Sequence, residues 1–156
     1  MGYEIERKFL VRKDLWYALK KPAGKEIIQA YLVNEPGKVV RIRLTDTEGY
    51  LTIKGASTGA TRPEYEYPIP RREALELVET LTSKRIEKTR YNIQFQRHLW
   101  EVDEFFGDND GLIIAEIELE HEDEPYERPP WVGEEVTSDL RYYNSNLSEH
   151  PFCSWK

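Results

Sequence analysis

The sequence contains only one cysteine, Cys153, so no disulfide can form within the chain and no metal site can be built from several thiolates. No apolar run approaches the length of a membrane span, and the chain reaches a charged segment at Glu4 without an apolar signal before it. We therefore expect a cytoplasmic protein that does not engage a membrane.

Basic residues are outnumbered, with 22 Lys and Arg against 29 Asp and Glu and a net charge of -7. This balance argues against a general nucleic-acid binder, because affinity for the phosphate backbone comes from unopposed basic residues. The sequence also lacks internal repeats and low-complexity segments. Its 156 residues leave room for one domain of ordinary size, and we expect residues 1–156 to form that domain.

Histidine is scarce, with only His98, His121 and His150. No Ser/His/Asp or Cys/His arrangement for a nucleophile stands out around them. His98 lies at odd spacing from Asp103 within one segment of strand-like alternation, so the two side chains should face opposite ways. We expect all three histidines to be structural or solvated.

Alternating polar and apolar residues, separated by turn residues, predict eight strands. Their approximate ranges are 2–12, 25–34, 38–46, 49–55, 62–69, 84–93, 97–105 and 112–121. Asn34–Gly37, Asp46–Gly49 and Gly107–Gly111 are turn sequences too short to hold a crossover helix, so they indicate antiparallel connections.

Helical spacing of apolar residues predicts a helix over 71–81, and a short helix is expected over 14–20. After residue 122 the chain becomes rich in proline and then polar, which favours turns and short helices packed against the sheet. The fold class is therefore α+β, mainly antiparallel β.

Like charges are doubled at positions i and i+2, which share one face of a strand. The pairs are Glu4/Glu6, Arg41/Arg43, Glu64/Glu66, Lys88/Arg90 and Glu116/Glu118. At a separation of roughly 6.6 Å and an effective dielectric near 20, two such charges repel by roughly 2.5 kcal/mol. A solvated sheet face explains any one strand, but a series of strands segregated by sign indicates a shared purpose.

Eight antiparallel strands with one charged face can close into a barrel that turns this face inward, and closure also removes the exposed edges. The opposite face is apolar and would be covered by helices. Its residues are Val40, Ile42, Leu44, Leu51, Ile53, Tyr65, Tyr67, Ile117 and Leu119. We expect a closed eight-stranded barrel whose charged tunnel is wet, internally paired or filled by a ligand.

The two charge signs of the predicted interior suit two kinds of ligand. Converging carboxylates favour a hard divalent cation such as Mg²⁺ or Mn²⁺, and converging Arg and Lys side chains favour phosphates. The inward positions carry six basic residues (Lys8, Arg41, Arg43, Lys54, Lys88, Arg90) and seven acidic ones (Glu4, Glu6, Glu64, Glu66, Asp103, Glu116, Glu118). Together they describe a site for a metal ion and a chain of phosphates.

The segment Glu4-Ile5-Glu6-Arg7-Lys8 matches the ExExK signature of the CYTH superfamily, the triphosphate tunnel metalloenzymes. The chain resembles the short bacterial members over nearly its whole length. The further matching segments are Arg41–Arg43, Leu51–Gly55, Glu64–Glu66, Glu87–Tyr91, Glu101–Asp103, Ala115–Leu119 and Glu135–Leu147.

This resemblance implies an eight-stranded tunnel that hydrolyses a triphosphate with Mg²⁺ or Mn²⁺. It implies metal ligands at Glu4, Glu6 and Glu118, with Glu116 assisting directly or through water, and phosphate binding by Lys8, Arg41, Arg43, Lys54, Lys88 and Arg90. Glu64, Glu66 and Asp103 would orient those bases or help to position a second metal ion and the attacking water. The residues expected to serve catalysis are thus Glu4, Glu6, Lys8, Lys54, Glu64, Glu66 and Asp103.

The leading hypothesis is an inorganic triphosphatase that cleaves tripolyphosphate to pyrophosphate and phosphate. Thiamine triphosphatase and adenylate cyclase of the class IV type are alternatives on the same fold, and a non-catalytic polyphosphate-binding module is an alternative of another class. The paired carboxylates of the first and last predicted strands favour an enzyme, because a binding module would need only the bases. The expected partner is a small-molecule triphosphate, and the sequence leaves a homodimer open.

Some residues have weaker indications. Glu101 and Glu120 share the inward parity and would lie at a tunnel rim, whereas Glu122–Glu127 is a charge run typical of a solvated loop. The four tryptophans are expected in the core or an interface rather than as platforms for nucleobases. Whether the C-terminal segment closes a tunnel mouth is left open.

Overall fold

The computed structural model describes residues 2–155. Within this range the chain forms nine strands: β1 (Tyr3–Val11), β2 (Lys25–Glu35), β3 (Lys38–Leu44), β4 (Gly49–Gly55), β5 (Thr61–Ile69), β6 (Arg85–Phe95), β7 (His98–Phe105), β8 (Ile113–Glu118) and β9 (Val132–Glu135). The helices are α1 (Lys13–Ala18), α2 (Arg71–Leu81), α3 (Asn144–Glu149) and the 3₁₀ turns η1 (Gly107–Asn109), η2 (Leu140–Tyr142) and η3 (Phe152–Ser154).

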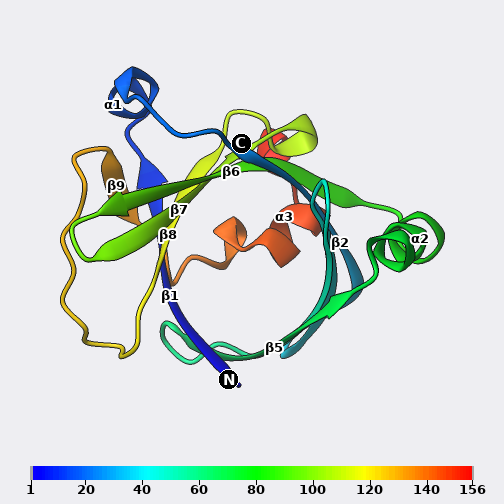
Figure 1. Ribbon diagram of the computed structural model, residues 1–156. Helices are drawn as coiled ribbons and strands as arrows, with labels where there is room; N and C mark the ends of the chain where they lie inside the picture. The colour runs from blue at the N-terminus through cyan, green and yellow to red at the C-terminus, as the bar shows by residue number, and fades with distance from the viewer. Residues whose placement is uncertain (1, 156) are drawn as a thin grey trace.

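The first eight strands close into an antiparallel barrel, as predicted (Figure 1). Their order around the ring is β5-β4-β3-β2-β6-β7-β8-β1, and β1 pairs again with β5 to complete it. The register sets predicted inward residues opposite one another: Glu6 faces Glu118 and Lys8 faces Glu116 across β1 and β8, while Lys54 faces Glu64 across β4 and β5. Because residues of one parity share a face, these pairs line the inside of the ring together.

The turn between β2 and β3 shows how the predicted hairpins form. Pro36 and Gly37 are its two central residues, and Gly37 adopts a φ of 77°. Proline presets the first turn position, and glycine reaches the left-handed conformation of the second at no steric cost. The strand therefore reverses within two residues and stays in the barrel.

The outer face of the barrel is covered in two places. Helix α2 packs its Ala74 and Val78 over Ala30, Ile42 and Leu44 of β2 and β3. On the far side a second cluster contains Phe9, three buried tryptophans (Trp16, Trp100, Trp131), Ile117 and Leu119. The expectation that the tryptophans belong to the core is confirmed for these three, and Trp155 packs against Tyr142 and Phe152.

Part of the predicted cover is wrong. Ile53, Tyr65 and Tyr67 point outward from β4 and β5 but are 38%, 48% and 52% exposed. Helix α2 packs against β2, β3 and β4, and the cluster that it covers also includes Ile69 at the end of β5 but none of these three residues. The alternation of apolar residues along β4 and β5 therefore predicted which way these side chains face, but not whether another element covers them.

Strand β9 was not predicted, since turns and short helices were expected after residue 122. It pairs with the C-terminal part of β1, with Phe9 opposite Glu135 and Val11 opposite Val132. The edge of β1 that pairs with β5 near the N-terminus is free further along, and β9 occupies it. Four residues interrupted by Gly133 give too short an alternation to reveal a strand.

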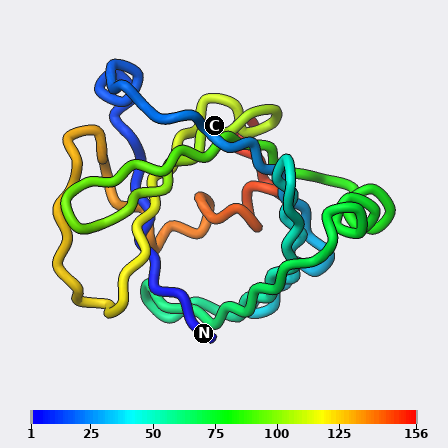
Figure 2. The backbone as a smooth tube through the Cα atoms, in the orientation of Figure 1, coloured from blue at the N-terminus to red at the C-terminus, as the bar shows by residue number. Residues whose placement is uncertain are grey.

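The C-terminal segment closes one end of the barrel, which answers the question that the sequence left open. The orange-red segment that contains η2 and α3 lies within the outline of the ring (Figure 2). Leu147 of α3 is buried in a third cluster of residues from the inward-facing positions of four strands: Leu10, Ile86, Phe105 and Ile114. The inward face is thus charged along part of its length and apolar at the end that α3 covers.

None of the helices within residues 2–155 combines the length and the apolar character needed to cross a membrane.

Candidate functional site

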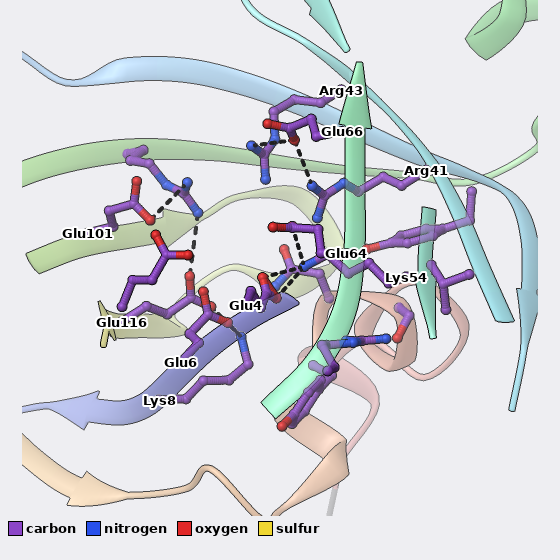
Figure 3. A pocket seen from close by; sticks show the side chains of 18 residues that line it. Glu4, Glu6, Lys8, Arg41, Arg43, Lys54, Glu64, Glu66, Glu101 and Glu116 are labelled. Atoms are coloured by element: carbon purple, nitrogen blue, oxygen red, sulfur yellow. Dashed lines mark hydrogen bonds and ion pairs between the residues drawn. The ribbon is translucent and has the colours of Figure 1, made fainter. Parts of the chain in front are cut away.

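A cavity of about 170 Å³ lies inside the barrel, and charged side chains make up most of its lining (Figure 3). We call it the central cavity. Of the residues predicted from the sequence, it is lined by Glu4, Glu6, Lys8, Arg41, Arg43, Lys54, Glu64, Glu66, Arg90, Glu116 and Glu118. The structure therefore brings together eleven of the thirteen predicted site residues from six strands.

The lysines of β1 and β4 are held by carboxylates. Lys8 Nζ donates to Glu6 Oε1 at 3.1 Å and also contacts Glu116 Oε2. Lys54 Nζ lies 2.8 Å from Glu4 Oε1 and 3.4 Å from Glu64 Oε2. Burial opposes the charged form of Lys8, but Glu116 and Glu6 outweigh it and raise the pKa of that lysine. Each lysine thus pairs with two carboxylates.

Glu118 marks the place where negative charge is least compensated. Burial, together with repulsion from the carboxylates of Glu6, Glu4 and Glu64, raises the pKa of Glu118 to about 7. No Lys or Arg among residues 2–155 forms an ion pair with it, whereas Glu4, Glu6, Glu64 and Glu116 all have basic partners. This region of the cavity favours a cation.

Within the described part of the chain, no three His, Cys, Asp or Glu side chains form a preassembled metal site. The geometry explains this, since Lys54 and Lys8 hold the carboxylates of Glu4 and Glu6. The donor set is nevertheless made only of carboxylate oxygens, which suits Mg²⁺ or Mn²⁺. The residues fit such an ion provided that the two lysines give up their carboxylates when it binds.

Arginines dominate the opposite side of the cavity. Arg41 lies 3.6 Å from Glu66, and Arg43 donates from Nε to Gln29 Oε1 at 3.0 Å. Burial, together with the nearby Arg41 and Arg90, lowers the pKa of Arg43 to about 10. The Nε of Arg41 is buried and has no hydrogen-bond partner among residues 2–155. These closely spaced guanidinium groups, one of which has an N–H without a hydrogen-bond acceptor, favour binding of an anion on this side of the cavity.

Asp103 and Lys88 are the two predicted site residues that do not line the central cavity. Asp103 Oδ1 accepts from Arg90 Nε at 2.8 Å, and its Oδ2 accepts from Arg90 Nη2 at 2.9 Å and lies 2.8 Å from Lys88 Nζ. Burial alone would raise the pKa of Asp103, but Arg90 and Lys88 together lower it. Lys88 also donates to Asn144 Oδ1 at 3.0 Å. This buried group lies behind the lining and holds the Arg90 guanidinium in place.

Comparison with known proteins identifies this arrangement. The CYTH domain model matches residues 2–150. The chain belongs to the CYTH family. An inorganic triphosphatase of Acetivibrio thermocellus is 50% identical over 157 residues, covering 100% of this chain and 99% of that protein. A second inorganic triphosphatase, from Nitrosomonas europaea, is 36% identical over 153 residues, covering 93% of this chain and 96% of that protein.

A solved structure agrees with the barrel of this CYTH domain. The crystal structure of the inorganic triphosphatase NE1496 matches with a TM-score of 0.64 and 34% sequence identity, and the match covers 93% of this chain and 97% of that chain. The family and the fold expected from the charged strands are therefore confirmed.

Several residues of the CYTH domain cavity were not predicted as site residues. Arg62 of β5 lines it, and its parity with Glu64 and Glu66 could have revealed this position. Glu101 lines the cavity too and lies 3.3 Å from Arg90, so the expectation of an inward rim residue is confirmed for it. Tyr31, Val39 and Tyr143–Ser145 complete the lining. Val39 shares the parity of Arg41 and Arg43, whereas no local sequence signal indicated the others.

Glu120 does not line the central cavity, and β8 ends at Glu118 rather than near residue 121. The charge run beyond it is exposed but not free of contacts, since Glu122 accepts from the backbone of Ala60 at 3.1 Å. His98 faces away from the cavity and lies 2.6 Å from Glu124, as its parity predicted. None of the three histidines contributes to the central cavity.

Proposed function

We propose that this CYTH domain hydrolyses inorganic tripolyphosphate to pyrophosphate and phosphate with the help of Mg²⁺ or Mn²⁺. The observation that carries this proposal is the division of the central cavity into a carboxylate side on β1 and β8 and an arginine side on β3 and β6. The two curated relatives are named inorganic triphosphatases, which supports the same activity.

The carboxylate side would hold the metal ion. Glu4, Glu6 and Glu118 are the proposed ligands, with Glu116 acting directly or through water. A bound divalent cation supplies charge neutralisation on the phosphates and lowers the pKa of an attacking water. The excess negative charge around Glu118 supports this placement, because a cation there relieves the repulsion that raises its pKa.

The basic residues would bind the phosphate oxygens. Lys8, Lys54, Arg41, Arg43 and Arg90 line the cavity and are proposed to bind the substrate directly. Asp103 and Lys88 would support Arg90 from behind, while Glu64 and Glu66 would orient Lys54 and the two arginines of β3. In the reaction the oxygen of water bonds to a terminal phosphorus as the bridging P–O bond breaks, and pyrophosphate leaves. Fixed positive charges stabilise the charge that develops on the leaving group.

An unsubstituted phosphate chain suits this cavity better than a nucleotide does. Apart from Val39 and the rings of Tyr31 and Tyr143, its lining consists of charged and polar side chains, so the central cavity itself offers no apolar slot for a purine. Two further expectations stay predictions from the sequence: that residues 1–156 act as one domain, and that the protein is cytoplasmic. A homodimer is left open.

The direct test compares orthophosphate release from tripolyphosphate, pyrophosphate, ATP and thiamine triphosphate, each with Mg²⁺, Mn²⁺ or chelator. We expect rapid metal-dependent release from tripolyphosphate, slower release from ATP and none with chelator. Faster turnover of thiamine triphosphate would replace the proposed substrate. Formation of cyclic AMP from ATP without orthophosphate would instead assign a cyclase, and binding of phosphates without any turnover would assign a binding module.

Changing Arg41 to Lys tests the arginine side of the cavity. Lysine keeps the charge but loses the planar fork that pairs with two phosphate oxygens. We expect KM for tripolyphosphate to rise about tenfold, since hydrogen bonds to charged groups contribute about 1.5–3 kcal/mol each. Arg97→Lys, at an exposed position in the turn after β6, is the matched control and should leave KM unchanged. Equal KM values for both variants would remove Arg41 from the substrate site.

A further inference from the structure

Three cavities follow one another through the barrel. A front cavity of about 220 Å³ shares Arg43, Glu66, Arg90 and Glu101 with the central cavity. A rear cavity of about 430 Å³ lies on the other side and also shares four residues with the central cavity. We call these four residues the partition: Val39, Arg62, Tyr143 and Ser145. The rear cavity lies at the end where the β2–β3 hairpin meets α3.

The partition is fixed from several directions. Tyr143 donates from its hydroxyl to the Thr137 carbonyl at 2.9 Å, and the Thr137 hydroxyl accepts from the backbone of Lys8 at 3.0 Å. Asn34 of β2 donates to the carbonyl of Ser145 at 2.7 Å. These bonds tie the partition to β1 and to β2. It is therefore part of the rigid barrel rather than a loop that swings aside.

The neighbouring residue Asn144 anchors the same segment from inside the barrel. Its Oδ1 accepts from Gln29 at 3.2 Å and from Lys88 at 3.0 Å. Gln29 and Lys88 are both buried, so these bonds are shielded from water. The Tyr143 ring is thus held between fixed points on either side of it along the chain.

Cations approach the Tyr143 ring from the two strands beside it. Lys8 Nζ lies 4.9 Å from the ring centroid and Arg62 Cζ lies 5.9 Å from it. Both distances are within the range of cation–π attraction. The inner end of the central cavity therefore combines positive groups that attract a terminal phosphate with an aromatic ring that blocks the way beyond them.

We propose that Tyr143 is a positioning residue that sets the register of a linear phosphate chain in the tunnel. The chain enters from the front cavity, and its inner phosphate stops against the Tyr143 ring beside Lys8 and Arg62. The bond that is cleaved is then always the same number of phosphates from that inner end, while a longer chain extends outward through the front cavity. This inference rests on the proposed hydrolase activity and adds the bond selected in a longer substrate.

Tripolyphosphate cannot reveal such a register, because cleavage of either of its bonds yields pyrophosphate and phosphate. Linear tetrapolyphosphate can. Addition of one water across a terminal P–O–P bridge gives tripolyphosphate and phosphate, whereas addition across the central bridge gives two pyrophosphates. The first products formed, measured by anion-exchange chromatography at low conversion, therefore report the position of the chain.

We expect the wild-type protein to form one product pair from tetrapolyphosphate with little of the other. In Tyr143→Ala the ring is gone and the central and rear cavities join, so the chain can shift inward by one phosphate. The ratio of the minor to the major product pair should then rise about tenfold or more, since productive geometry depends on placement within about 1 Å. Metal-dependent turnover of tripolyphosphate should remain measurable, because the proposed metal ligands Glu4, Glu6 and Glu118 are unchanged, but its KM should rise once the ring beside Lys8 no longer stops the inner phosphate.

Two variants serve as matched controls. Tyr143→Phe keeps the ring and loses only the bond to Thr137, so it should keep the wild-type product ratio. Leu140→Ala enlarges the rear cavity, which Leu140 lines, but keeps the Leu140 carbonyl that accepts from the backbone of Tyr143, so it too should leave the ratio unchanged. If Tyr143→Ala shows no cooperative unfolding transition and is therefore not properly folded, Tyr143→Leu is used in its place. Leucine also lacks the ring and opens part of the space between the central and rear cavities.

The outcomes separate this inference from the function on which it rests. An absence of metal-dependent turnover of tripolyphosphate would overturn the proposed function itself. Normal turnover of tripolyphosphate with the same product ratio in wild type and Tyr143→Ala, or a mixed product pattern already in the wild type, would overturn only the register. Refusal of tetrapolyphosphate by a wild-type protein that cleaves tripolyphosphate would also contradict the register, because the inference lets a longer chain extend outward through the front cavity.

Discussion

Glu6→Gln is expected to lower kcat for tripolyphosphate by about 100-fold or more while leaving the fold intact. Glutamine has the shape of glutamate but lacks the negative charge that a divalent cation needs. The carboxylate of Glu6 lies opposite Glu118 in the β1–β8 register, at the place where negative charge is least compensated. Its loss should therefore weaken the metal site, while Lys8 keeps its contact with Glu116.

Two measurements check this expectation. The first is steady-state turnover at saturating tripolyphosphate with Mg²⁺ or Mn²⁺. The second needs no turnover: Mn²⁺ alone should raise the Tm of the wild-type protein, because a ligand of the folded state at about 100 times its Kd stabilises by about 2.7 kcal/mol. In Glu6→Gln this rise should be much smaller. Glu134→Gln, at an exposed position of β9, is the matched control for both.

A Glu6→Gln variant with wild-type turnover would remove Glu6 from the metal site. If turnover fell but the Mn²⁺-dependent rise in Tm stayed, the carboxylate would matter for holding Lys8 rather than for holding the metal.

Both expectations follow from an exchange of charge partners. Lys8 and Lys54 pair with the carboxylates that a metal ion would need. Desolvated charges without partners are costly, so a tunnel lined by both signs pairs them internally. When a triphosphate and a cation enter together, each side of the cavity gains an external partner and the internal pairs become dispensable. A phosphate chain alone or a metal ion alone would satisfy only one side, which favours joint binding.

The strand periodicity explains why so much of the site could be predicted. A period of two assigns each residue to one face, so doubled charges such as Arg41 and Arg43 had to point the same way. Closure of the sheet then turned that face inward. The same parity applied to Arg62 would have found one more cavity residue, because it shares the face of Glu64 and Glu66 on β5.

Other features depend on tertiary contacts that no local pattern encodes. The parity that predicts Lys88 as inward also holds for Ile86. Ile86, however, packs against Leu147 of α3 at the apolar end of the tunnel, and strand parity does not reveal where that end begins. Tyr143 reaches the cavity only because the C-terminal segment folds back across the ring. Asp103 has the right parity but lies behind Arg90, since its carboxylate is fully occupied by two buried bases.

Removing the charge of Asp103 is expected to cause the largest loss of stability among the tunnel residues. Asp103 and Lys88 side chains are each 1% exposed, and Arg90 is 12% exposed. Asp103→Asn would leave the buried Arg90 guanidinium without this carboxylate and would remove the anion that favours the charged form of Lys88, whose pKa burial lowers to about 7. Breaking a buried ion pair by removing one partner costs about 3–5 kcal/mol, because the remaining charge stays desolvated.

The free energy of unfolding, measured by urea denaturation, tests this expectation. Asp139→Asn is the matched control, since Asp139 pairs with Arg141 at 2.7 Å on the surface, where side-chain exposures are 34% and 65%. Surface pairs contribute about 0–1 kcal/mol, so this control should change little. Equal losses for the two variants would show that the buried group carries no special energetic weight.

A second variant distinguishes charge imbalance from a packing defect at Asp103. Lys88→Met removes one of the two cations with a side chain of similar length and no charge. Combined with Asp103→Asn, it should recover part of the lost stability, because residues that share one ion-pair network are not additive and couple by about 0.5–3 kcal/mol. The double variant should still have a raised KM for tripolyphosphate, since Arg90 would no longer be held by the two bonds from its guanidinium to Asp103. Strict additivity of the two losses would mean that Asp103 stabilises the barrel by filling space, and its part in orienting Arg90 would then have no support.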